Sequence, residues 1–438
     1  MNDESAAASA ERVDESGGRH VPSTRLLDRR PTLNQMNLLF SGVMLGWAGV
    51  FGSGVSVLFS GAILLAFLRL YQRKIVFPSD RAILAVALAF AFYLAADVIS
   101  GLFHNDGMVT WRQVAKDIPF LGFAFVYARL CLSRREDVLD AVERGAISGA
   151  FATLLVTGAE LTFTAHDRAE GLAGNPGVLA VISSLVYGIC LLAAVRHEKR
   201  MRWVALLSAL AAATALLFTG MRALWPFLLI GPAIPLLVLR PKLHWPAVAR
   251  GALVAAIPVL VVGYFAYDVV ETRVNALVQS VEKIEAGKHD VSLGRRVVVW
   301  KHGLEKAEEN PIIGSGPGSI QEDSAEVFGV SHYHNFLLNA LVKSGVPGVL
   351  AILGLFIVPL VVVVRRLRPA DETGLAGLSL LLTLQITFLL SGSVGIMLGH
   401  DIHDALFIYG TIVACFLVAG KQTLPTTPTL SHAGTASS

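Results

Sequence analysis

Two histidines stand immediately before a long apolar stretch, in the segment SHYHNFLLNALVKSGVPGVL (residues 331–350). A neutral imidazole can accept a proton near neutral pH, so His334 is a candidate general base, with an interfacial polar residue at a helix start as the alternative. His332 would lie on the same side of an extended segment. Because no third ligand has suitable spacing, we expect no metal, and we expect His332 to line a pocket or to be exposed.

The composition defines the elements that must position these histidines. Of the 438 residues, 54% are hydrophobic and 16% are charged, and the mean hydropathy is +0.61. The apolar residues form blocks of about 20, the length of a membrane-spanning helix, without the alternation typical of a transmembrane β-barrel. These features predict an all-α polytopic membrane protein. A net charge of +3, spread over many short loops, argues against nucleic-acid binding.

The apolar blocks predict about twelve spans, at 37–52, 54–71, 82–103, 117–132, 145–163, 172–195, 203–219, 221–239, 250–270, 346–364, 374–396 and 402–420. Lysine and arginine gather in the N-terminal segment and in the loops after even-numbered spans, which places both termini in the cytoplasm. The expected organisation is a disordered cytoplasmic tail (1–35), nine spans (36–270), one large, mostly helical loop on the outer side (271–345), three spans (346–420) and a second disordered cytoplasmic tail (421–438).

The start of the tenth span cannot be one straight helix. A helix over 335–364 would have 30 residues and measure about 45 Å, longer than a hydrocarbon core of roughly 30 Å. The pair Ser344-Gly345 offers a helix end. We therefore expect a short amphipathic helix over 335–344, with Asn335 as its N-cap and Lys343 at its negative end, followed by a separate span.

Isolated charges near the predicted outer ends of spans are further candidates. Arg222, in FTGMRALWPF, falls in a connection so short that its guanidinium must lie at or near the membrane boundary. Arg222 either binds a ligand there or anchors the span by extending its guanidinium to the membrane interface. Asp97, Glu160 and Asp268 could orient an arginine or an acceptor, or could be simple interfacial groups. The three cysteines, Cys131, Cys190 and Cys415, have no metal-ligand spacing, so we expect no disulfide and no zinc.

Four segments together resemble the O-antigen ligase family, which also includes O-antigen polymerases and bacterial O-linked oligosaccharyltransferases. The first is His334-Asn335, nine residues, Gly345, two residues and Gly348. The others are SLGRRVVVW (292–300), ENPIIGSGPG (309–318) and GLAGNPGVLA (171–180). The topology, with one large loop before the histidine motif, is also similar, so the resemblance covers nearly the whole chain.

The resemblance implies a GT-C-like glycosyltransferase of lipopolysaccharide biosynthesis, active at the periplasmic face of the bacterial inner membrane. Its donor would be a glycan on undecaprenyl diphosphate and its acceptor lipid A-core, with no cofactor, nucleotide or metal. His334 would be the base, and Arg222 and Arg296 would hold the diphosphate. The residues implied in supporting or structural roles are Asn335, Arg295, His332, Arg168, Gly345 and Gly348.

Other functions remain open. An O-antigen polymerase or a protein O-oligosaccharyltransferase shares the donor and the topology and differs in the acceptor. A secondary transporter is a possibility from another class, but the chain shows no repeat between its halves and few ionisable residues at mid-membrane depth. The GSGPG segment (314–318) lacks the Lys-Ser/Thr of a P-loop, so we expect a tight turn there.

Overall fold

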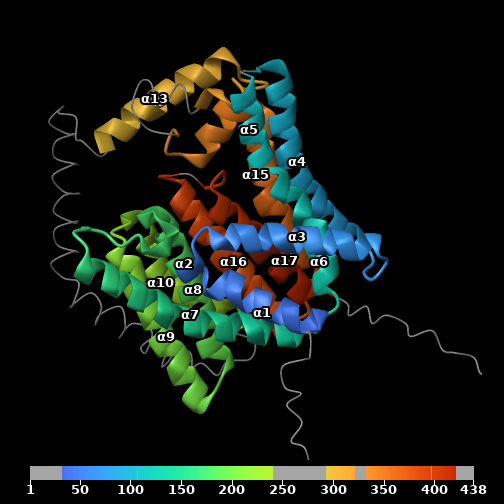
Figure 1. The fold of residues 1–438 in the computed structure, drawn as a ribbon, viewed down its shortest axis with the longest axis vertical. Coiled ribbons are helices and arrows are strands. Elements are labelled where there is room, and N and C mark those ends of the chain that lie inside the picture. Colours follow the sequence, from blue (N-terminus) through green and yellow to red (C-terminus); the bar gives the residue numbers. More distant parts are fainter. Residues whose placement is uncertain (1–31, 106, 240–292, 321–331, 396, 421–438) are drawn as a thin grey trace, which may run out of the picture.

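A computed structural model describes residues 32–105, 107–239, 293–320, 332–395 and 397–420, and every regular element in these ranges is a helix (Figure 1). In chain order the helices are α1 (Leu33–Gly46), α2 (Ala48–Phe51), α3 (Gly54–Tyr71), α4 (Arg81–Phe103), α5 (Met108–Lys116), η1 (Ile118–Leu121), α6 (Gly122–Leu130), α7 (Arg135–Phe163), η2 (Gly171–Ala173), α8 (Pro176–Arg196), α9 (Lys199–Phe218), η3 (Arg222–Leu224), α10 (Pro226–Val238), α13 (Leu293–Glu309), α15 (Phe336–Arg366), α16 (Glu372–Gly392) and α17 (Asp401–Ala419), where η marks a 3₁₀ helix.

Eight of the described helices are long and apolar enough to cross a membrane: α3, α4, α7, α8, α9, α15, α16 and α17. They confirm the all-α, polytopic class. The block at 250–270 and residues 1–31 and 421–438 of the two tails lie outside the described residues, so the number of spans stays a prediction. The N-terminal tail was predicted to extend to residue 35, but α1 already begins at Leu33, where Thr32 caps the helix. Helix α7 begins at Arg135 rather than at residue 145, because an apolar block marks only the part of a helix suited to lipid, while helical hydrogen bonding continues through its polar turns.

The prediction of one continuous span over 117–132 is wrong. The structure instead has η1, with Pro119 in its first turn, followed by α6. Helix α6 has nine residues and is about 14 Å long, too short to cross a membrane alone. The block 221–239 is also divided, into η3 and the 13-residue α10. Apolar composition does not distinguish a continuous helix from one that proline and turns interrupt.

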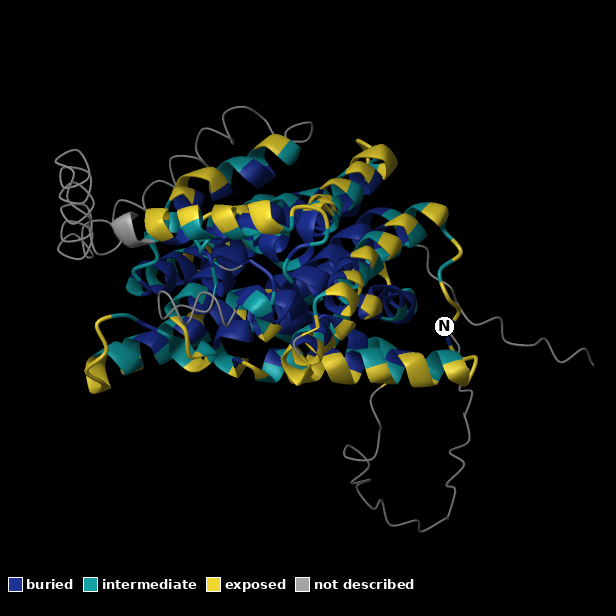
Figure 2. Cartoon of the chain, turned by 90° about the horizontal axis from the view of Figure 1, so that it is seen from above, coloured by how far each residue is buried: buried dark blue, intermediate teal, exposed yellow. Residues whose placement is uncertain are grey.

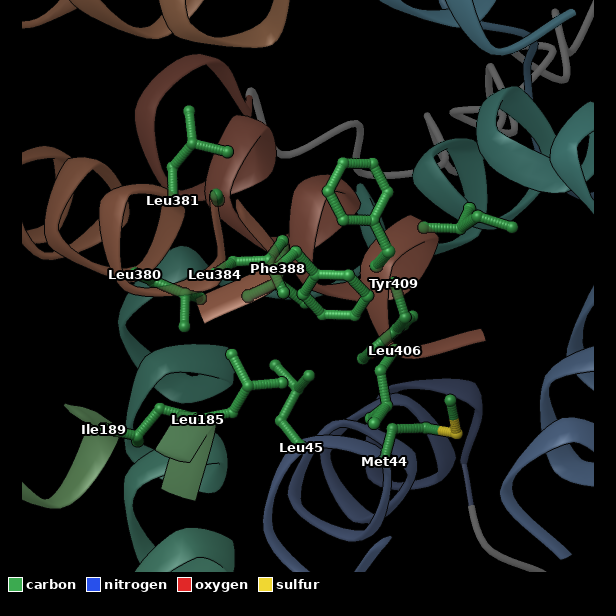
Figure 3. Packing of buried hydrophobic residues seen from close by; sticks show 14 of the residues in the cluster. Met44, Leu45, Leu185, Ile189, Leu380, Leu381, Leu384, Phe388, Leu406 and Tyr409 are labelled. Atoms are coloured by element: carbon green, nitrogen blue, oxygen red, sulfur yellow. The ribbon is translucent and has the colours of Figure 1, made fainter. Parts of the chain in front are cut away.

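The core lies where α8, α16 and α17 pack together, and buried residues occupy the middle of the molecule while exposed residues cover its outer helices (Figure 2). Almost all of the apolar window of α8 and of α17 is buried, 94% in each. Figure 3 shows how side chains of four helices meet there. Its labelled residues are Met44 and Leu45 of α1, Leu185 and Ile189 of α8, Leu380, Leu381, Leu384 and Phe388 of α16, and Leu406 and Tyr409 of α17.

Helices α1 and α7 cross with their backbones in contact. Gly42 and Gly46 of α1 face Gly145 and Gly149 of α7, and a Cβ on Gly149 would lie 1.9 Å from the carbonyl oxygen of Gly46. Pairs of small residues four apart allow such close packing inside a membrane, where apolar surface gains little by leaving lipid. This crossing fixes the N-terminal helices against the core.

Three helices frame the region that contains the histidine motif. Helix α15 runs beside α4 over much of its length, and α5 continues from α4 along the same side (Figure 1). Helix α13 packs across the beginning of α15, where Tyr333 and Leu338 join Val299 and Ala307 in a small separate cluster of buried residues. Within the outer loop, which the sequence predicts to be mostly helical, residues 293–309 form α13. The histidine motif therefore enters α15 between α13 and the α4–α5 pair.

Candidate active site

Helix α15 is interrupted where the short amphipathic helix was predicted to end. Ser344 and Gly345 have non-helical backbone angles, with a φ of 64° at Gly345. The side-chain oxygen of Asn335 caps the first part of the helix by accepting hydrogen bonds from two backbone N–H groups, at 3.0 Å each. The predicted break and the predicted N-cap are both confirmed, and the break lets the histidine motif lie at an angle to the following span.

The Asn-Pro-Ile-Ile-Gly-Ser-Gly segment (310–316) docks against this break. The N–H of Ser315 donates to the carbonyl of Val342 at 2.7 Å, and the N–H of Gly316 donates to the carbonyl of Lys343 at 3.2 Å. These bonds satisfy carbonyl groups that a helix end leaves unpaired. The segment thus caps the short helix from outside, in agreement with a tight turn rather than a nucleotide-binding loop.

Glycine is required where the two backbones cross. A Cβ on Gly314, whose φ is 80°, would lie 2.6 Å from the amide nitrogen of Gly345. A Cβ on Gly345 would lie 2.3 Å from the carbonyl oxygen of Ile312, and one on Gly348 would lie 2.6 Å from that of Ala340. The two motif glycines of α15 therefore mark positions that have no space for a side chain.

Lys343 has a role that the sequence analysis missed. Its Nζ forms ion pairs with Asp97 of α4 and, at 3.0 Å, with Asp117 at the end of α5. The hydroxyl of Ser344 donates to Asp97, and that of Ser100 donates to the carbonyl of Lys343 at 2.8 Å. Both carboxylates are buried. The network connects α4 and the end of α5 to the break in α15. In the sequence, its charged members stand out only as isolated charges within apolar blocks.

His334 adopts an uncommon backbone conformation. Its φ is 52°, in the left-handed region, which a residue with a side chain adopts only when its surroundings hold it there. The following residue is the helix cap, and on the other side Asn339 Oδ1 accepts the N–H of Tyr333 at 2.9 Å. The ring of Tyr333 is buried beneath α13. The fold therefore determines the position of the His334 imidazole through contacts on both sides.

The two histidines lie side by side. Their ring centroids are 4.3 Å apart, with 58° between the ring planes. Burial, together with the neighbouring His334 and Arg296, lowers the pKa of His332 to about 4. His332 is thus neutral at near-neutral pH, so it places no second positive charge beside His334.

The charges of Arg222 of η3 and Arg296 of α13 act on each other. Burial, and after it the charge of Arg222, lowers the pKa of the Arg296 guanidinium. The charge of Arg296 in turn acts on His332. The two arginines and the two histidines therefore form one electrostatically connected site. An anion between the arginines would relieve their repulsion, and arginine forks bind phosphate oxygens in pairs.

Arg168 supports the connection that carries Arg222. Its Nε donates to the carbonyl of Thr219 at 2.7 Å, and the next N–H, that of Ala169, donates to the carbonyl of Phe218 at 2.9 Å. Arg168 thus acts on the site through the backbone. The side chain of Arg295 lies outside the described part of the structure.

The acidic candidates have structural partners. Glu160 accepts the N–H of Gly171 at 2.7 Å and contacts the ring of His166 at 3.2 Å, so it orders the loop before α8 rather than an arginine. Asp97 holds Lys343, and Asp268 lies outside the described residues. In the part of the chain that the structure describes, no three His, Cys, Asp or Glu side chains gather in a way that could hold a metal ion.

Together, the helices define a polytopic α-helical membrane protein in which two arginines and two histidines interact beside a broken helix. Residues 177–353 match the family model described as O-antigen ligase. This stretch contains the two arginines, the histidine pair and the two motif glycines of α15, and the match confirms the resemblance to the O-antigen ligase family over these residues. A comparison with curated proteins finds no match.

Proposed function

We propose that this protein is the glycosyltransferase that joins O-antigen, carried on undecaprenyl diphosphate, to lipid A-core at the periplasmic face of the inner membrane. The family of residues 177–353 supports the reaction class. The observation that supports the assignment of roles is the electrostatic link from Arg222 through Arg296 to His332, whose ring lies beside that of His334. These groups come from η3, α13 and the entry to α15, and they supply what transfer from a diphosphate needs.

The arginines would hold the diphosphate of the donor. The leaving group gains negative charge as its bond to the sugar breaks, and fixed guanidinium groups stabilise that charge in the transition state. Arg296 is half-buried, which strengthens its interaction with an anion relative to one in water. Apolar helices next to the site would accommodate the prenyl tail, so the donor binds as a lipid with its charged head at the arginines.

His334 would act as the general base. The acceptor hydroxyl oxygen attacks the anomeric carbon, and its proton passes to the His334 imidazole. The bond between that carbon and the phosphate oxygen breaks, and undecaprenyl diphosphate leaves with the electron pair. Attack from the side opposite the diphosphate inverts the anomeric configuration. A positioned base contributes about 10²–10⁴-fold to such a step, and no metal ion or nucleotide is required.

Transfer by the purified full-length protein tests this function. The protein in detergent is given an undecaprenyl-diphosphate glycan, with or without lipid A-core, in the presence of EDTA. We expect glycan on lipid A-core only when the acceptor is present. Longer glycan on the carrier would show an O-antigen polymerase, and glycan on a supplied acceptor protein would show an O-oligosaccharyltransferase. Absence of glycan transfer with lipid A-core, with the acceptor protein and without any added acceptor would contradict the proposal and favour a transporter.

A further inference from the structure

A cavity of about 100 Å³ opens beside the histidine pair. Its walls come from α4, α5, the first part of α15 and residues 397–399. His332 lines it, whereas His334, Arg222 and Arg296 do not. The cavity therefore lies against the histidine whose ring neighbours that of the proposed base, and away from the proposed diphosphate site.

The chemistry of the walls is mixed. Gln113 and Lys116 of α5 line the cavity together with Asn339 of α15, and Phe336 and Ile352 add apolar surface. Nδ2 of Asn339 is buried and has no hydrogen-bond partner among the described residues. Amide groups and an ammonium group beside an aromatic ring are what a hydroxyl-rich ring requires, since each hydroxyl both donates and accepts.

The charges of the side chains around the cavity also favour a sugar over a multiply charged group. Lys343 adds no unpaired positive charge, because it forms ion pairs with both Asp97 and Asp117, and His332 is neutral near pH 7. Lys116, on the exposed side of α5, adds one positive charge at the rim.

We propose that this cavity binds the receiving sugar of the acceptor glycolipid, and that Gln113 and Lys116 determine acceptor affinity. The proposal rests on the proposed function, and it names the place from which the acceptor hydroxyl meets the base. The sugar enters between α5 and α15 and contacts His332, and the attacking hydroxyl lies at the edge of the cavity that is nearest to His334. The donor occupies the arginine side, so the two substrates approach the histidines from separate sides.

Two readouts on the full-length protein test this placement. The first is binding of lipid A-core without any donor, with lipid A that lacks core sugars as the reference ligand. The second is the steady-state KM for lipid A-core and for the donor. The variants are Gln113→Leu and Lys116→Met, and the matched control is Arg112→Met, which alters an exposed residue of α5 that does not line the cavity.

We expect Gln113→Leu and Lys116→Met each to weaken lipid A-core binding and to raise its KM by about three- to tenfold, as the loss of one hydrogen bond does. The donor KM, kcat, the binding of core-free lipid A and all properties of Arg112→Met should stay within about twofold of wild type. Unchanged lipid A-core binding in both variants, or a rise in the donor KM alone, would overturn the proposal. Weakened binding in a protein that transfers no glycan would contradict the proposed function and leave the sugar site standing.

Discussion

Gly314 and Gly345 meet backbone to backbone, so that a Cβ on Gly314 would lie 2.6 Å from the amide nitrogen of Gly345. This contact joins the loop after α13 to the break in α15. It sets the angle at which the short helix, and with it His334, leaves the following span. Two glycine motifs that are separate in the sequence therefore form one structural unit.

Replacing Gly345 should lower stability and displace the histidine motif. Its φ of 64° and the 2.3 Å approach to Ile312 leave no space for a methyl group. We expect Gly345→Ala to lose about 2 kcal/mol or more of unfolding free energy, measured by thermal unfolding in detergent. Gly158→Ala is the matched control, because a Cβ there meets nothing within 4 Å, and it should be neutral or slightly stabilising. Equal stability of the two variants would contradict the close crossing.

The ion pairs of Lys343 predict strong destabilisation when only the lysine is removed. Lys343→Met leaves Asp97 and Asp117 buried without their cation, and such a loss typically costs about 3–5 kcal/mol. Substituting both aspartates by asparagine in the same chain should restore much of the apparent melting temperature, because the remaining groups are then neutral. If Lys343→Met alone were as stable as wild type, the ion-pair network would contribute little to stability.

The partners of Lys343 illustrate what the sequence could not reveal. The break at Ser344-Gly345 was predictable, because helix length against bilayer thickness is a local comparison. The pairing with Asp97 and Asp117 depends on packing between segments far apart in the chain, and each aspartate alone resembles an interfacial group. The amphipathic interpretation of Lys343 considered only its own helix, so it placed the charge at the helix end instead of in a buried network.

The candidate site was predictable to a different degree for each residue. Family-like segments selected His334, Arg222 and Arg296, but their spacing along the chain contains no information on distance. The electrostatic interaction between the arginines joins η3 to α13, two segments that are far apart in the chain. The left-handed φ of His334 was not predictable either, because a turn of this kind shows in sequence mainly when glycine or asparagine occupies it.

The pKa of His332 predicts a dependence of stability on pH. It is about 4 in the folded protein, against an ordinary value of 6.5. Below pH 6.5 the unfolded chain binds a proton that the folded chain does not, so stability is fully present above pH 6.5 and is lost as the pH falls through about 4. The apparent melting temperature should therefore decrease less on acidification in His332→Gln than in wild type. If the melting temperatures of wild type and His332→Gln decreased equally on acidification, the lowered pKa of His332 would be contradicted.

His197 offers a control of opposite sign. A hydrogen bond with Glu143 raises the pKa of His197 above 6.5. Its contribution to stability is therefore fully present below pH 6.5 and is lost as the pH rises through the folded pKa. His197→Gln should lose stability mainly at acid pH. Its apparent melting temperature should therefore fall more steeply on acidification than that of wild type, whereas the melting temperature of His332→Gln should fall less steeply. The same shift in both variants would indicate a general effect of removing a histidine.

The arginine pair predicts a defect specific to the donor. Arg222→Gln and Arg296→Gln should each lower kcat/KM for the undecaprenyl-diphosphate donor by about 10–100-fold, as the loss of a charge-assisted hydrogen bond does. Arginine-to-lysine variants should recover part of this loss, since they retain the charge without the paired geometry. Lys301→Gln, at an exposed position of α13, is the control and should be unaffected. A similar loss of kcat/KM in Lys301→Gln would contradict specific binding of the donor diphosphate by Arg222 and Arg296.

The most direct test of the account is glycan transfer by purified His334→Ala compared with wild type and with His166→Ala, which removes an exposed histidine. Both variants are first shown to match wild type in melting temperature and in donor binding. The account predicts that His334→Ala loses about 10²–10⁴-fold in kcat while His166→Ala transfers normally. Full transfer by a correctly folded His334→Ala would contradict the assignment of the base.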